Sequence, residues 1–213
     1  MDFQPMKYIF QPATNPSTAT LLLLHGTGGN EHDLLLLAKE FGDSFNILSL
    51  RGNVTENGMP RFFRRLGMGI FDEADLAFRT DEMVSFIKEL SVIEGFDSTK
   101  IIALGYSNGA NIAGATLVQY PNFLAGAILY RPMQPFKQLP DFRNTEKTPV
   151  FISTGKYDPT IRVADTTEYV QALEKAGFAI SSYLLSTSHN LTQEDITLTS
   201  QWLANTQVLS KTA

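Results

Sequence analysis

The sequence contains no cysteine, which excludes a disulfide, a thiolate nucleophile and a cysteine-based metal site. Basic clusters are also missing: the longest is the pair Arg64-Arg65, and the formal net charge is −5 at pH 7. A chain of this charge is a poor partner for nucleic acid or an anionic membrane surface. It also has no signal-like N-terminus and no apolar run of bilayer-spanning length. We therefore expect a cytoplasmic protein that does not insert into membranes.

Histidine is scarce as well, with only three in the chain, at positions 25, 32 and 189. The first two are seven residues apart across a turn, which is not a metal-ligand spacing, so we expect no metal site. The glycine-rich stretch HGTGG (residues 25–29) is followed by no Gly-Lys-Ser/Thr and has no dinucleotide-binding spacing. The sequence therefore predicts a protein without a cofactor.

Strand-like and helix-like patterns alternate along the 213 residues, which have enough hydrophobic residues (43%) for one sizeable core. We expect a single domain, 1–213. The predicted strands are 6–10, 19–25, 45–51, 100–104, 125–130, 149–154 and 180–185, and the predicted helices are 30–42, 75–95, 108–119, 160–176 and 192–204. Residues 52–74 have no clear period and are predicted to be a long functional loop. This order indicates an α/β protein with a doubly wound, mostly parallel sheet and helices on both faces.

The pentapeptide Gly105-Tyr106-Ser107-Asn108-Gly109 stands between a predicted strand and a predicted helix. It matches the G-x-S-x-G nucleophile elbow, in which a serine occupies a tight strand-to-helix turn and flanking glycines avoid collisions with neighbouring chain. Backbone N–H groups at the helix start can stabilise negative charge there. The motif predicts that Ser107 attacks acyl groups.

A base and its orienting carboxylate follow in the chain order that such elbow enzymes use, which is serine, aspartate, histidine. His189 comes just after strand 180–185 and is the only histidine downstream of Ser107, so we predict that it is the general base. Asp158, after strand 149–154, is predicted to orient it. Alternatives remain open: Asp141 or Asp165 could take that role, Asp158 could merely cap the helix near residue 160, and His189 could be an ordinary surface histidine.

The oxyanion that forms during acyl transfer needs two N–H donors. We assign one to the backbone of Thr27, in the glycine-rich turn, and the other to the backbone of Asn108, directly after the nucleophile. His25 is predicted to pack under this turn with hydrogen bonds to the backbone, and His32 to be exposed.

Substrate-binding residues are predicted from the loop 52–74 and from the segment after strand 125–130. The candidates are Met59, Arg61, Phe62, Phe63, Arg64, Arg65, Met68, Met133 and Phe136. Apolar members could line an acyl pocket, and the arginines could meet an anionic group on the substrate. Equally, the aromatic residues could cover the edge of the sheet while the arginines form surface ion pairs.

Four segments together, HGTGG, GYSNGAN, YDP and SHNLTQED, resemble the phospholipase/carboxylesterase group of α/β hydrolases, and the resemblance runs from Leu21 to Leu203. Within that group the chain is most similar to small bacterial carboxylesterases related to those induced by hydroquinone or catechol stress. One position departs from the group: Ser188 stands before the histidine, where glycine is common.

The resemblance implies an α/β-hydrolase fold with a small or absent lid and a cofactor-free serine carboxylesterase. Such an enzyme would cleave short- to medium-chain acyl esters through an acyl-enzyme on Ser107. An acyl-thioesterase or a lysophospholipase would use the same three residues, and a non-catalytic ligand-binding module is a third alternative. The sequence leaves the oligomeric state open, and a homodimer is compatible with it.

Overall fold

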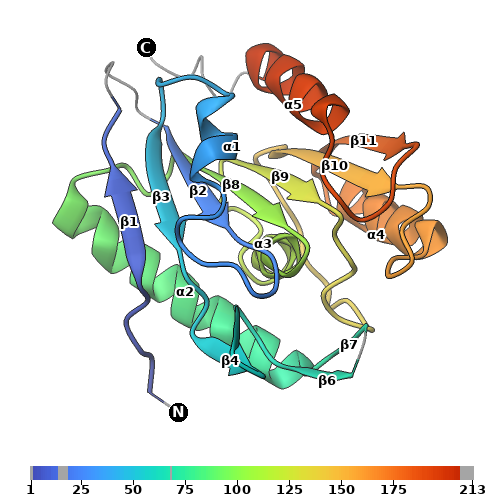
Figure 1. Ribbon diagram of the computed structural model, residues 1–213, viewed down its shortest axis with the longest axis horizontal. Coiled ribbons are helices and arrows are strands. Elements are labelled where there is room, and N and C mark those ends of the chain that lie inside the picture. Colours follow the sequence, from blue (N-terminus) through green and yellow to red (C-terminus); the bar gives the residue numbers. More distant parts are fainter. Residues whose placement is uncertain (1, 14–18, 68, 207–213) are drawn as a thin grey trace.

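A seven-stranded sheet forms the centre of the protein, in a computed structural model that describes residues 2–13, 19–67 and 69–206. The strand order is β1-β3-β2-β8-β9-β10-β11 (Figure 1). The bounds are β1 Tyr8–Gln11, β2 Thr20–Leu24, β3 Asn46–Leu50, β8 Ile101–Tyr106, β9 Gly126–Tyr130, β10 Pro149–Gly155 and β11 Ala179–Leu185. Only β1 is antiparallel to its neighbour in this sheet. The predicted α/β-hydrolase fold with a mostly parallel sheet is confirmed.

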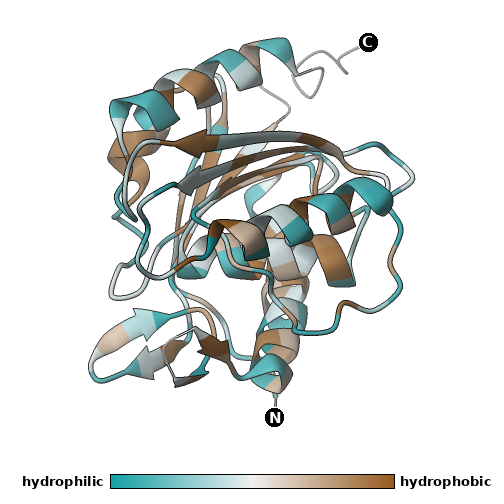
Figure 2. Cartoon of the chain, turned by 90° about the vertical axis from the view of Figure 1, so that its right-hand side faces the viewer, coloured by the Kyte–Doolittle hydropathy of each residue, from teal (hydrophilic) through white to brown (hydrophobic). Residues whose placement is uncertain are grey.

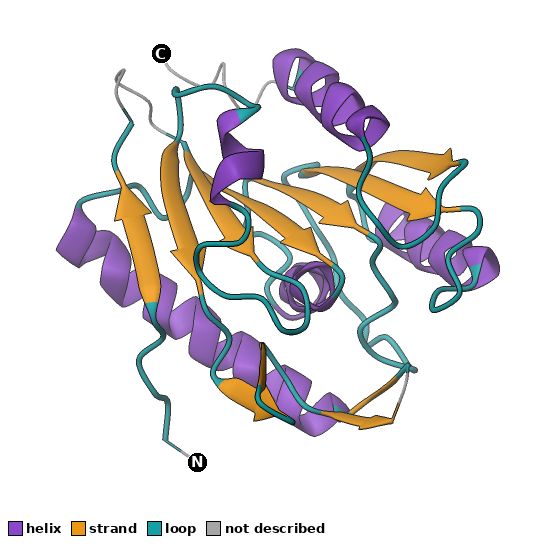
Figure 3. Ribbon diagram, in the orientation of Figure 1, coloured by secondary structure: helices purple, strands orange, loops and turns teal. Residues whose placement is uncertain are grey.

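Helices cover both faces of the sheet (Figures 1 and 3). Their bounds are α1 Leu35–Lys39, α2 Glu73–Glu94, α3 Asn108–Gln119, α4 Val163–Lys175 and α5 Gln193–Asn205. Every residue of β2 is buried, and its alternate leucines belong to two separate cores. Leu22 and Leu24 pack with residues of α2, α3 and α4, whereas Leu21 and Leu23 pack with residues of α1 and α5. Continuous apolar strands are therefore explained by burial on both faces.

Apolar residues gather on the strands, and many hydrophilic residues lie on the outer turns of the helices (Figure 2). Within the described ranges, no helix combines the length and the apolar character needed to cross a bilayer.

The helix predicted over 30–42 is much shorter in the structure, where only α1 is helical. The residues before it form turns. Asn30 accepts a hydrogen bond from the backbone N–H of His32 at 2.9 Å and so caps a turn instead of a helix. Glu31, 8% exposed, forms an ion pair with Arg51 after the end of β3. This tertiary contact holds the segment in a conformation that local helix signals do not reveal.

Residues 52–74 are also more regular than predicted. They contain two antiparallel hairpins, formed by β4 (Val54–Glu56) with β5 (Met59–Arg61) and by β6 (Arg65–Gly67) with β7 (Ile70–Phe71). Asn57 and Gly58 connect the first pair with φ angles of 51° and 79°, as a tight two-residue hairpin turn requires. Strands of two or three residues are too short to show a period, which is why the sequence indicated a loop.

Candidate active site

Ser107 lies in the sharp turn between β8 and α3, with φ 52° and ψ −111°. Its backbone N–H donates to the carbonyl of Tyr130 at 2.9 Å, which ties the turn to the end of β9. A Cβ on Gly109 would come within 1.9 Å of the Leu24 carbonyl oxygen, and one on Gly105 within 2.5 Å of the Gly109 backbone. Both glycines are therefore required by close backbone approach, as the elbow motif predicts.

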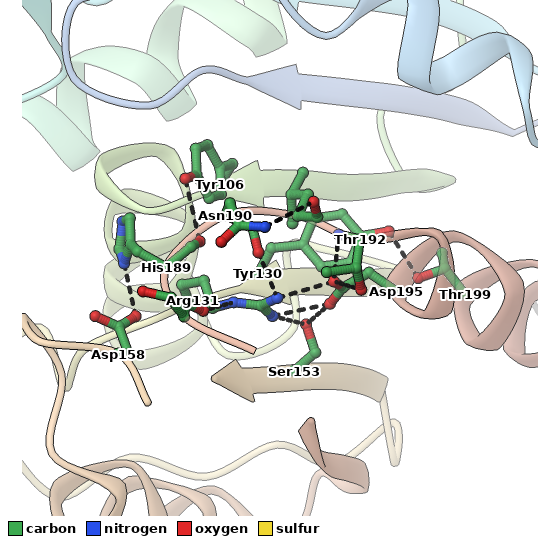
Figure 4. A network of polar contacts seen from close by, with 12 residues as sticks. Tyr106, Tyr130, Arg131, Ser153, Asp158, His189, Asn190, Thr192, Asp195 and Thr199 are labelled. Carbon is green, nitrogen blue, oxygen red and sulfur yellow. Dashed lines mark hydrogen bonds and ion pairs between the residues drawn. The ribbon is translucent and has the colours of Figure 1, made fainter. Parts of the chain in front are cut away.

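His189 lies between Ser107 and Asp158, in the segment that connects β11 to α5. Its Nε2 is 2.9 Å from the Ser107 Oγ. Its Nδ1 is 2.6 Å from the Asp158 Oδ2, a contact that Figure 4 shows. A carboxylate can only accept hydrogen bonds, so Nδ1 carries the proton and Nε2 is left to accept from the serine hydroxyl. The structure thus brings together the three side chains that were predicted from motifs far apart in the sequence.

The Asp158 carboxylate is fully buried at its side chain and has a second partner in Thr160. Thr160 donates its backbone N–H at 2.8 Å and its hydroxyl at 2.7 Å to the Asp158 Oδ1. Burial raises the pKa of Asp158, but the hydrogen bonds from Thr160 and His189 outweigh burial and hold the pKa below its usual value. The group is therefore ionised at neutral pH beside the imidazole.

The positions of Asp158, Asp165 and Asp141 distinguish the alternatives that the sequence left open for the partner of His189. It caps the turn at Thr160, whereas α4 has Arg162 as its N-cap residue, so capping and the contact with His189 coexist. Asp165 forms an exposed ion pair with Arg162, and Asp141 is exposed in an irregular segment. Of the three aspartates, Asp158 is the one in hydrogen-bond contact with His189.

The glycine-rich turn after β2 and the start of α3 face the same cleft as Ser107, and this cleft is lined by both Thr27 and Asn108. The turn closes through a hydrogen bond from Gly29 N–H to the Gly26 carbonyl at 3.1 Å, and the Thr27 hydroxyl accepts from Arg61 Nη1 at 2.6 Å. Asn108 is 2% exposed, and its side-chain Nδ2 has no hydrogen-bond partner among the described residues. Both residues predicted to supply the oxyanion donors therefore line the same cleft as Ser107.

The cleft at Ser107 has a volume of about 180 Å³, and a neighbouring hollow of about 270 Å³ shares part of its wall. The shared residues are Gly69, Phe71, Met133 and Ile161. Three of the predicted substrate-binding residues, Arg61, Arg65 and Met133, line the cleft, and Phe136 lines the hollow. Met59 lies instead against the glycine-rich turn and is 37% exposed, and Met68 lies outside the described residues.

Phe62 and Phe63 are not in the cleft wall. They are 1% and 0% exposed and belong to the core formed with α2 and α3. The ring centroids of Phe62 and His25 are 4.7 Å apart, and those of Phe63 and Phe71 are 5.0 Å apart. The hairpins place these consecutive aromatic residues inward, where burial of large apolar surface favours them. Their predicted role in substrate binding is replaced by core packing.

The arginines of this region differ from one another. The Arg64 side chain is half exposed and forms ion pairs with Asp72 and Asp75, which fits the alternative that the arginines form surface ion pairs. Arg61 is 3% exposed, and burial lowers the pKa of its guanidinium. Glu56 pairs with both Arg61 and Arg65, so two cations share one carboxylate at the edge of the cleft.

The other two histidines lie as the sequence predicts. His25 is 1% exposed, its Nδ1 donates to the Gly26 carbonyl at 2.6 Å and its Nε2 accepts from the Gly52 N–H at 3.1 Å. Burial lowers its pKa, so it is neutral. The His32 side chain is 68% exposed. In the described ranges, no group of three or more His, Asp or Glu side chains is placed to hold a metal ion.

Three hydrogen bonds to the backbone of the His189 segment were not predicted from the sequence. Tyr106 donates its hydroxyl to the His189 carbonyl at 3.2 Å, and Arg131 donates to the carbonyls of Ser188 and Asn190. The available signal was position: Tyr106 and Arg131 stand at the carboxyl ends of adjacent strands, where parallel sheets concentrate functional side chains.

Known proteins are similar to this chain in both sequence and fold. A model of the phospholipase/carboxylesterase family matches residues 6–206. The putative hydrolase MhqD of Bacillus subtilis (strain 168) is 45% identical over 199 residues, which are 92% of this chain and 97% of MhqD. The carboxylesterase of Bacillus cereus superposes with a TM-score of 0.90 at 45% identity, covering 93% of each chain. The structure of YahD with malic acid gives a TM-score of 0.88 at 32% identity, covering 94% of this chain and 99% of YahD. The chain belongs to the phospholipase/carboxylesterase family of α/β hydrolases.

Proposed function

We propose that this protein is a serine carboxylesterase in which Ser107 is the nucleophile, His189 the general base and Asp158 the group that orients the base. The observation that carries the proposal is the hydrogen-bonded series from Asp158 through His189 to Ser107, with distances of 2.6 and 2.9 Å. Membership of a family of esterases and hydrolases supports the same chemistry.

In the proposed mechanism the Ser107 Oγ forms a bond to the ester carbonyl carbon while its proton passes to the His189 Nε2. The carbonyl oxygen becomes an oxyanion, which accepts from the N–H groups of Thr27 and Asn108. The bond from carbon to the leaving oxygen then breaks, and the imidazolium returns its proton to the departing alcohol. Water repeats the sequence on the acyl-enzyme and releases the acid.

The site favours small substrates. A cleft of about 180 Å³ accommodates a short acyl group, and the neighbouring hollow offers the apolar side chains of Phe71, Met133 and Phe136 for a longer or bulkier part. Arg61 and Arg65 both pair with the Glu56 carboxylate at the cleft edge. YahD was determined with a small dicarboxylic acid, malic acid, so esters that carry a carboxylate belong in the test panel.

The decisive test compares the wild-type protein with Ser107→Ala on p-nitrophenyl acetate, butyrate and octanoate. We expect the variant to lose at least about 10⁴-fold in kcat/KM while its melting temperature is retained, because only the attacking atom is removed. A fluorophosphonate probe should label Ser107 in the wild-type protein and nothing in the variant. Turnover retained by a folded Ser107→Ala variant would refute the proposal.

The acyl thioesters and lysophospholipids that the same three residues could cleave are separated from oxygen esters by a substrate panel. We expect the highest kcat/KM for oxygen esters of short acyl chains, because the cleft at Ser107 is small. A higher kcat/KM for long-chain thioesters or lysophospholipids would reassign the substrate class and leave the nucleophile unchanged.

A further inference from the structure

The backbone on both sides of His189 is held by side chains and not by a strand ladder. Three consecutive carbonyls, those of residues 188, 189 and 190, each accept a side-chain hydrogen bond (Figure 4). Arg131 donates Nε to the Ser188 carbonyl at 3.3 Å and Nη2 to the Asn190 carbonyl at 2.9 Å. Tyr106 donates to the carbonyl between them at 3.2 Å. A loop that would otherwise be free to shift is thereby fixed at the residue that carries the imidazole.

The Arg131 guanidinium is fully buried and makes five hydrogen bonds, which matches its five N–H donors. Besides the two carbonyls, Nη1 contacts the Ser153 Oγ at 2.7 Å and the Asp195 Oδ1 at 2.8 Å, and Nη2 contacts the Asp195 Oδ2 at 2.8 Å. A lysine has three donors on a single nitrogen and cannot reproduce this planar arrangement. The site is therefore specific for arginine.

Asp195 is the counter-charge that keeps the guanidinium in place. It is buried, accepts from Ser153 Oγ at 2.6 Å and closes the capping box of α5 with Thr192. Burial raises the pKa of Asp195, but the hydrogen bonds from Arg131 and Ser153 outweigh burial and lower it overall. The ion pair therefore connects the start of α5 to the His189 segment.

The backbone of Arg131 adds a separate observation. Its φ is 55°, in the left-handed region that non-glycine residues seldom occupy because the Cβ is crowded there. A glycine would fit this turn at lower conformational cost, yet the chain places a large charged residue there. Strain of this kind persists where the side chain has a role that offsets it.

We propose that Arg131 is a positioning residue for the reaction: by holding the carbonyls on both sides of His189, it keeps the imidazole within reach of Ser107, and Asp195 holds Arg131 in turn. This inference rests on the proposed function. It extends that function because the five hydrogen bonds of the guanidinium go to Ser153, Asp195 and two backbone carbonyls, and to none of the three proposed catalytic side chains. A misplacement of about 1 Å at such a base lowers the rate roughly 100-fold.

The test uses Arg131→Lys, Arg131→Ala and Tyr106→Phe. We expect kcat to fall roughly 10- to 100-fold in the two Arg131 variants and several-fold in Tyr106→Phe, with KM changed less than about threefold, because substrate contacts remain while the base is displaced. Guanidinium ion at millimolar concentration should restore part of kcat in Arg131→Ala. The matched controls are Arg79→Lys and Arg79→Ala, because Arg79 pairs with Asp75 and Glu82 on α2 away from the cleft.

Folded Arg131 variants with wild-type kcat would overturn the inference, as would equal losses in the Arg79 controls. If Arg131→Ala does not fold because it leaves Asp195 unpaired and buried, Arg131→Lys and Tyr106→Phe decide the question. A readout without turnover separates this inference from the proposed function. The His189 Nδ1 proton, observed by NMR, should exchange with water faster in Arg131→Lys than in the wild-type protein. An unchanged exchange rate would contradict the positioning role of Arg131, even in a protein that proves inactive on esters.

Discussion

His25 and His189 both follow strands at the carboxyl edge of the sheet, yet their exposure and their hydrogen-bond partners differ. His25 is buried, and both its ring nitrogens bond to backbone groups of Gly26 and Gly52. The His189 side chain is 29% exposed, and its ring nitrogens bond to the side chains of Asp158 and Ser107. The comparison teaches that position at the strand ends does not assign chemistry to a histidine. A histidine is a candidate general base when one ring nitrogen faces a hydroxyl and the other faces a carboxylate, as the ring of His189 does.

The largest effect should come from removing the imidazole that faces Ser107. We expect His189→Gln to lower kcat by about 10⁴-fold or more, because no group remains to take the serine proton. The measurement is kcat on a p-nitrophenyl ester, with His32→Gln as the matched control, since the His32 side chain is 68% exposed and outside the cleft. A similar loss in the control, or a small loss in His189→Gln, would remove the distinction between the histidines.

The carboxylate behind His189 gives the next largest effect. In Asp158→Asn the side chain can donate to Nδ1, which favours the imidazole tautomer with its proton on Nε2, facing Ser107. We expect kcat to fall roughly 10³- to 10⁴-fold at pH 7.5 while the fold is retained. Asp165→Asn, at an exposed pair with Arg162, is the control and should keep kcat within about twofold. Fluorophosphonate labelling of Ser107 should slow in parallel, and rapid labelling of Asp158→Asn would argue that His189 needs no orienting group.

The smallest effect, on stability, belongs to His25. His25→Leu leaves the Gly52 N–H without its acceptor and should lower the free energy of unfolding by about 1–3 kcal/mol at pH 8. Urea unfolding measures it, with His32→Leu as control. The difference in the free energy of unfolding between the wild-type protein and His25→Leu, the wild-type advantage, should also depend on pH. Because burial lowers the folded-state pKa of His25, the advantage is complete above the ordinary pKa of about 6.5 and shrinks as the pH falls toward the lowered value. A constant difference between wild type and variant from pH 8 to 5.5 would contradict a neutral, buried His25.

The sheet and the proposed reacting residues could be predicted because strong local signals carry them. The apolar strands buried on both faces stand out as continuous runs, and the glycines beside Ser107 reflect a backbone contact that no side chain can replace. Helix α3 begins and ends where the sequence indicates. Asp158 and His189 follow because strand ends of a parallel sheet meet at one edge.

The remaining features depend on contacts between distant segments. The pairing of Glu31 with Arg51 accompanies the short α1. Phe62 and Phe63 lie between two hairpins and are buried, and those hairpins are too short to show a period in the sequence. Arg131 follows a predicted strand, but its role could not be predicted from that position. The role depends on the contacts of its guanidinium with Asp195 and with the carbonyls of residues 188 and 190, which come from distant segments. Sequence patterns indicate local conformation, whereas the structural roles of these residues depend on contacts with residues far away in the sequence.

The contact between Gly109 and the Leu24 carbonyl has a consequence for engineering the enzyme. Backbone lies against backbone there, so the spacing between the helix that follows Ser107 and the turn that contains Thr27 cannot be changed by exchanging side chains. Libraries that randomise this side of the cleft should yield mostly unfolded protein. The hairpin β6–β7 forms a sheet of its own, and its residues line the cleft together with Met133. We expect variants with altered substrate preference to be found among substitutions there.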